Sequence, residues 1–108
     1  SRGLGMCIRD RDYLEVLLPT GWAGMGVEKR RAWFQEDDSI REAGTQQRDY
    51  ISAVEVWAEC FGNDPHRFPR QDRAEVNTIL RQLQGWKEEP RRQRCGPYGQ
   101  QTRFRRVP

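Results

Sequence analysis

The residues of this sequence that could do chemistry concentrate between Gly85 and Pro108, in the stretch GWKEEPRRQRCGPYGQQTRFRRVP. Seven of these residues are Lys or Arg, and two are Glu. Guanidinium and ammonium groups bind phosphate oxygens, and aromatic rings among them can stack on exposed bases. The stretch therefore predicts a surface that contacts nucleic acid. Its candidate DNA-binding residues are Lys87, Arg91, Arg92, Arg94, Tyr98, Arg103, Arg105 and Arg106.

Two structures are possible for this stretch, a disordered basic tail or a folded hairpin. The segments 86–94 and 100–107 have the length of strands, and the Gly- and Pro-containing segment 95–99 between them is typical of a hairpin loop. A disordered tail would not need the rings of Trp86, Tyr98 and Phe104. We therefore predict a basic β-hairpin, a wing, over residues 86–107.

A long amphipathic helix is predicted immediately before the wing, over residues 70–84. Val76, Ile79, Leu80 and Leu83 follow the i, i+3, i+4, i+7 rule of one helical face, and Gly85 ends the pattern. The opposite face carries three more candidate DNA-binding residues, Arg73, Asn77 and Arg81. Arg and Asn are residue types that read guanine and adenine edges in a groove. Asp72 and Glu75 on the first turn would repel phosphates, so the wing is the stronger candidate surface.

A second helix is predicted upstream, over residues 52–61, after a short extended piece at Tyr50 and Ile51. Ser52 and Glu55 have the spacing of a capping box, and the apolar residues that follow lie on one face. Strand, helix, turn, long helix and hairpin follow one another in the order of a winged helix. The predicted fold is mainly α with a small β-hairpin: a winged-helix-like domain over 48–108, preceded by an irregular arm over 1–47 with a short helix near 27–35.

Composition limits the other functions. The net charge of +3 combines a net −3 over residues 1–69 with a net +6 over residues 70–108, which indicates a basic surface for an anionic partner. No apolar run reaches the roughly 18 residues of a membrane span, and no phosphate-binding loop of the Walker type is present. The acidic run Glu36–Asp38 is interpreted as a solvated loop and His66 as a surface residue. We expect no catalytic site, metal or cofactor in this chain.

Several short patterns resemble the C-terminal end of the virulence-associated protein E family of phage, prophage and plasmid replication proteins. They are Arg48-Asp49 followed by Glu55-x-Trp57-x-Glu59, the junction Leu83-x-Gly85-Trp86, and the wing tip Tyr98-Gly99-x-Gln101. The resemblance implies a C-terminal domain of a primase- or helicase-type protein in the cytoplasm of a bacterial host. Its expected partners are DNA and other subunits or domains of the parent helicase. It implies no catalytic residues here, because the ATPase motifs of the family lie upstream.

One alternative from a different class stays open. A protein-interaction module could dock on a helicase subunit or a host replication factor through the aromatic residues Trp22, Trp33 and Phe34 of the arm. The basic face would then be incidental. A free-standing transcriptional repressor is less favoured, because no heptad or long apolar helix is present to form a dimer.

Overall fold

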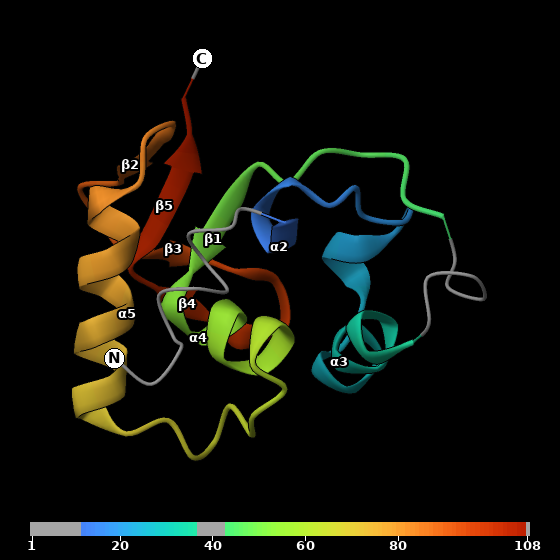
Figure 1. Ribbon diagram of the computed structural model, residues 1–108, viewed down its shortest axis with the longest axis horizontal. Coiled ribbons are helices and arrows are strands. Elements are labelled where there is room, and N and C mark those ends of the chain that lie inside the picture. The colour runs from blue at the N-terminus through green and yellow to red at the C-terminus, as the bar shows by residue number, and fades with distance from the viewer. Residues whose placement is uncertain (1–11, 37–42, 108) are drawn as a thin grey trace.

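Three short segments that lie far apart in the sequence form the central sheet of the protein. The computed structural model describes residues 12–36 and 43–107 (Figure 1). In it β1 (Tyr50–Ser52), β2 (Trp86–Glu88) and β5 (Arg103–Arg106) pair antiparallel in the order β1–β5–β2. Phe104 of the central strand pairs with Ile51 on one side and Glu88 on the other, and its ring is fully buried. The fold is therefore α+β, with a larger sheet than the predicted hairpin.

The long helix predicted before the wing is confirmed as α5 (Arg70–Gln82). Val76, Ile79 and Leu80 are buried, as the apolar spacing predicted, and they share the core with Phe104. The helix ends two residues earlier than expected. The chain then turns at Gly85, whose φ of 88° is one that residues with a side chain rarely adopt. Figure 1 shows α5 running alongside the sheet.

The helix predicted over 52–61 is present but is not a regular α-helix. It begins as α4 (Ala53–Glu55) and continues as the π-helical segment η2 (Val56–Cys60). The hydrogen bonds predicted for the capping box are not formed. Ser52 makes no side-chain cap; its hydroxyl donates to Glu55 Oε2 at 2.8 Å instead. Both side chains are buried.

The wing is confirmed as a hairpin, but it consists of two separate ladders. β2 pairs with β5, and further out β3 (Gln93–Arg94) pairs with β4 (Gln100–Gln101). Pro90 lies between the two ladders, where it has no N–H to donate. The tip is the short helix η3 (Gly96–Tyr98).

The part of the chain predicted to be an arm supplies core residues. It contains α2 (Asp12–Glu15), η1 (Trp22–Gly24) and α3 (Val27–Gln35), the last at the residues predicted for a short helix. Tyr13 and Leu14 of α2 pack into the same cluster as Ile51, Val56 and Phe104. The arm and the following residues therefore share one core, with α3 on the far side of α4 from α5 in Figure 1.

Among the described residues, no helix combines the length and the apolar character that crossing a membrane requires.

Candidate nucleic-acid interface

Five of the candidate DNA-binding residues have side chains that are exposed to solvent. Arg92 is exposed, and its Nη2 atom donates to the backbone oxygen of Gln100 at 2.6 Å. The other four are exposed and form no side-chain hydrogen bond or ion pair with any residue that the structure describes. We call these five residues the basic wing: Lys87, Arg91, Arg92, Arg94 and Arg105. An exposed cation that forms no ion pair remains available to attract a phosphate.

Arg103, by contrast, is occupied by an acidic neighbour. Its Nη2 atom donates to Glu89 Oε1 at 3.1 Å, and its Nε atom donates to the other oxygen of the same carboxylate. The Nη1 atom donates to the backbone oxygen of Arg94 at 3.2 Å, and the guanidinium lies over the Tyr50 ring. The fork of donors that would hold a phosphate is already used inside the protein.

The ion pair between Arg103 and Glu89 makes the stability of the fold depend on pH in the acidic range. The hydrogen bond from Arg103 lowers the pKa of Glu89 below its usual value. A carboxyl whose pKa is lower in the folded state stabilises the fold above its unfolded pKa of about 4.3, and this stabilisation disappears as the pH falls through the folded pKa. We expect Glu89→Gln to lower the urea midpoint at pH 6, and the difference from the natural protein to shrink as the pH falls below about 4.3.

The neighbouring Glu88→Gln is the control for this titration, because Glu88 pairs with the exposed Arg81 at 2.8 Å and exposed pairs contribute little. Equal midpoint changes for both variants, or a Glu89→Gln difference that is the same at pH 3 and pH 6, would contradict the assignment.

Arg106 also has a role inside the protein. Its Nε atom donates to the backbone oxygen of Arg48 at 2.8 Å, and its Nη2 atom donates to the backbone oxygen of Leu14 at 3.1 Å. Its Nη1 atom lies 3.2 Å from Glu15 Oε1, and the guanidinium covers the Trp86 ring. Arg106 therefore connects α2 to the central sheet. Its position in a basic run of the sequence did not indicate this role.

Tyr98 was predicted to stack on bases, but its hydroxyl is directed into the protein. It donates to Glu59 Oε2 at 2.8 Å, and the Arg30 guanidinium lies 5.7 Å from the ring centre. Burial and the Glu59 carboxylate raise the pKa of Tyr98 well above its usual value. The residue anchors the tip of the wing to the core.

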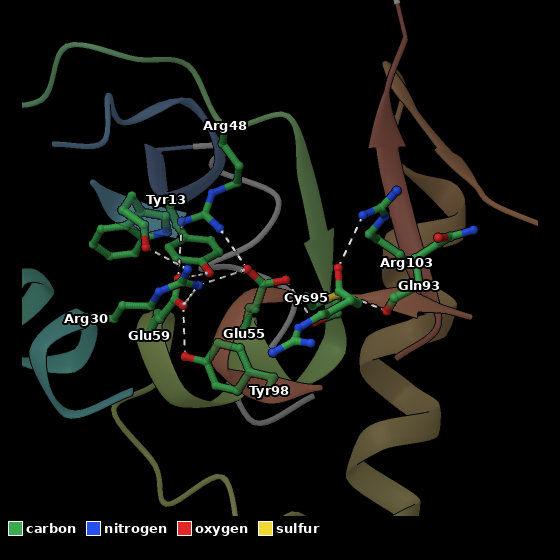
Figure 2. A network of polar contacts seen from close by, with 12 residues as sticks. Tyr13, Arg30, Arg48, Glu55, Glu59, Gln93, Cys95, Tyr98 and Arg103 are labelled. Atoms are coloured by element: carbon green, nitrogen blue, oxygen red, sulfur yellow. Dashed lines mark hydrogen bonds and ion pairs between the residues drawn. The ribbon is translucent and has the colours of Figure 1, made fainter. Parts of the chain in front are cut away.

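Glu59 is the centre of this anchor (Figure 2). Besides Tyr98, it accepts hydrogen bonds from the Tyr13 hydroxyl at 2.9 Å, Arg48 Nη2 at 3.2 Å and Arg30 Nη1 at 3.5 Å. Its side chain and that of Arg30 are fully buried. One carboxylate thus joins α2, α3, the residues before β1 and the wing tip to η2.

A second carboxylate, that of Glu55, lies beside this centre. Glu55 Oε1 is 3.6 Å from Arg30 Nη1 and 3.5 Å from Arg48 Nη1. Burial, followed by the nearby Glu59 charge, raises the pKa of Glu55 to about 8. We call Tyr13, Arg30, Arg48, Glu55, Glu59 and Tyr98 the buried polar network.

The sequence did not reveal this network. Glu55 and Glu59 are four residues apart and so lie on one helical face, but that spacing is equally typical of a solvated face. Arg30 and Arg48 are isolated charges in the sequence. The available signal was the pattern Arg48-Asp49 with Glu55-x-Trp57-x-Glu59, which carried the family resemblance and contains three of the network residues.

The candidate residues of α5 separate into two places. Arg73 and Asn77 line a cavity of about 410 Å³ together with Arg92, Gln101 and Thr102 of the hairpin and Ala53. Arg81 is engaged at the other end of the helix, where its Nε and Nη2 atoms donate to the Glu88 carboxylate. The structure therefore brings Arg73 and Asn77 close to Arg92 but not to Arg81.

The aromatic residues of the alternative docking surface are packed inside the chain. Trp22 and Trp33 are buried with Leu18, and Phe34 contacts both indole rings edge-on. Both indole side chains are therefore covered in this conformation, whereas Phe34 is half-buried. Within the described residues, no group of three or more His, Cys, Asp or Glu side chains is arranged to hold a metal ion. Asp37 and Asp38 of the acidic run lie outside those residues.

No protein-family model matches the sequence, and a search of curated proteins finds no match.

Proposed function

We propose that this chain is a winged-helix-like DNA-binding domain that contacts phosphates through the basic wing. The observation that carries the proposal is the exposure of five basic side chains on one hairpin, none of which forms a hydrogen bond or ion pair with a carboxylate of the described residues. Each phosphate that such a cation neutralises releases counterions from the DNA, which favours binding. Phosphate contacts of this kind position a protein on DNA without reading its sequence.

The order of the elements supports the winged-helix part of the proposal. β1, α4 with η2, α5 and the β2–β5 hairpin follow one another along the chain, and β5 returns to lie between β1 and β2. This is the arrangement expected of a helix-turn-helix that is followed by a wing. It puts α5, with Arg73 and Asn77, next to the hairpin.

The anchored tip supports the binding role. Because Tyr98 bonds to Glu59 in the core and β2 pairs with β5, the part of the hairpin that carries Arg91, Arg92 and Arg94 is held at both ends. A surface that is ordered before binding loses less conformational entropy when it binds. In the family that the sequence resembles, such a domain would hold a replicative primase or helicase on its template, and the ATPase activity would belong to other parts of that protein.

Fluorescence-anisotropy titrations against single-stranded, duplex and forked DNA at two salt concentrations test the proposal. We expect binding that weakens steeply with salt. For duplex DNA, the double variant Arg91→Ala/Arg94→Ala should reduce the slope of log K against log salt by about 0.9 for each phosphate that the variant no longer neutralises. The fold should persist, because both side chains are exposed.

The matched control is Lys29→Ala/Arg67→Ala, which removes the same charge from two exposed residues outside the wing. If the control weakens binding as much as the wing variant, net charge and not the wing is responsible. If the unchanged protein does not bind any of the three DNA forms at low salt, the proposed function is wrong.

A further inference from the structure

We infer that the cavity between α5 and the hairpin, which we call the Arg73–Arg92 groove, is a binding site for one phosphate group of a nucleic-acid strand. The inference rests on the proposed function and adds a specific place to it. The wing as a whole offers separate cations, whereas the groove offers several donors that converge on one volume. A phosphate held there would fix the position of the strand relative to α5.

The lining of the groove fits an anion. Two guanidiniums, those of Arg73 and Arg92, enter it from α5 and from the hairpin, and Thr102 adds a hydroxyl. The side chain of Asn77 belongs to the same lining, and an amide NH₂ group is a further hydrogen-bond donor. No carboxylate is among the lining residues. This set of donors matches the oxygens of a phosphate.

Two contacts fix the position of the Arg73 guanidinium. Its guanidinium lies 4.5 Å from the centre of the Phe68 ring, and its Nη1 atom donates to Gln101 Oε1 at 3.2 Å. The Gln101 amide is itself fixed, because its Nε2 atom donates to the backbone oxygen of Tyr98 at 3.0 Å. A guanidinium has five N–H groups, so most of the donors of Arg73 remain for a ligand.

The positive charges of Arg73 and Arg92 are not neutralised by any other residue that lines the groove. Burial and, next, the nearby Arg92 charge lower the pKa of Arg73. Arg81, Arg103 and Arg106 each have a carboxylate partner, whereas the partners of Arg73 within residues 12–36 and 43–107 are the neutral Gln101 and Phe68. A bound anion would remove the repulsion between the two guanidiniums. The cavity of about 410 Å³ is also large enough to admit the sugar that carries the phosphate.

The groove can be tested with inorganic phosphate as the probe. The protein is titrated with phosphate at constant ionic strength, with chloride as the replacement ion, and the side-chain Nε–H signals of Arg73 and Arg92 are followed by NMR. We expect saturable shifts of both signals with phosphate and none with chloride. Arg92→Ala should weaken phosphate binding about tenfold or more, in keeping with the loss of a charged hydrogen bond.

Arg67→Ala is the matched control. It removes the same side chain from an exposed position outside the basic wing, which does not line the groove, and we expect phosphate affinity within about twofold of the original. Linear shifts without saturation, or equal losses in the two variants, would overturn the inference. Arg73→Lys keeps the charge but not the planar fork, and it should also weaken phosphate binding.

Two DNA experiments separate this inference from the proposed function. If the protein binds DNA in a salt-dependent way but the Arg73 and Arg92 signals do not saturate with phosphate, the function stands and the groove is wrong. If phosphate saturates the groove but no DNA binds, the assignment to nucleic acid is overturned. Oligonucleotides with and without a 5′-phosphate then identify the source: tighter binding of the first indicates a terminal phosphate, and equal binding an internal one.

Discussion

Glu59→Ala is expected to lower the free energy of unfolding by about 3–5 kcal/mol, because breaking a buried ion pair from one side leaves its partner uncompensated. Glu59 is 3% exposed, and it accepts hydrogen bonds from two guanidiniums and two tyrosine hydroxyls. Alanine would leave all four donors without this acceptor. Native proteins are stable by about 5–15 kcal/mol, so this loss is a large fraction of the total stability.

Urea denaturation followed by tryptophan fluorescence measures this loss. Glu59→Gln keeps an acceptor oxygen and the side-chain volume but not the charge, and we expect it to fall between the original protein and Glu59→Ala. Glu36→Ala is the control, because Glu36 is an exposed carboxylate just after α3. Its effect should stay within about 0.5 kcal/mol. A Glu59→Ala variant as stable as this control would show that the buried polar network does not hold the fold together.

Leu80→Ala is expected to lower the free energy of unfolding by about 2–5 kcal/mol, the range for removing a buried leucine side chain in a core. Leu80 has no exposed surface, and it lies in the cluster that also contains Val76, Trp86 and Phe104. The loss combines the apolar area returned to water with the cavity that remains. A sheet of three short strands has little freedom to fill that space.

Thr78→Ala is the matched control on the same helix. Thr78 is exposed, and its hydroxyl donates to the backbone oxygen of Ala74. Alanine is the better helix former, so we expect no loss of stability beyond about 0.5 kcal/mol. If thermal or urea unfolding shows Leu80→Ala to be as harmless as Thr78→Ala, the apolar face of α5 is not the one that builds the core.

α5 could be predicted from the sequence because its stability depends on local spacing. Val76, Ile79 and Leu80 recur with the helical period, and Gly85 supplies the turn after it. The hairpin was predictable for a similar reason, since its loop residues are close to one another in the chain. Pro90 interrupts the pairing, and the consequence of that interruption, two short ladders, was not anticipated.

The surroundings of the helix that begins at Ala53 were harder to predict from the sequence, because distant residues create them. Residue type alone assigns Glu55 and Glu59 to a solvated face. Their burial depends on Arg30 and Arg48, which reach them from other parts of the chain. Hydrophobic periodicity contains no information about such partners. For the same reason, the first residues of α2 looked like an irregular linker, although Tyr13 and Leu14 are buried.

The candidate interface was predicted in outline and not in detail. Counting charges identified the hairpin as basic, and five of its cations are exposed. The same count could not separate Arg103 and Arg106 from the others, because Glu89 and Glu15 occupy them only in the folded chain. Tyr98 was assigned to the outside on similar grounds, and its hydroxyl is directed to Glu59.

The place of β5 in the sheet has a consequence for biosynthesis. β5 pairs with both β1 and β2, yet it is synthesised after both of them. Tyr50 of β1 and its partner Arg105 of β5 are separated by more than half of the chain. Pairs so distant in sequence form slowly, and unpaired strand edges favour aggregation. A ribosome must therefore release residues 103–106 before the sheet can close. Until then the nascent chain exposes two unpaired edges and an open core, and it would benefit from a chaperone that covers them.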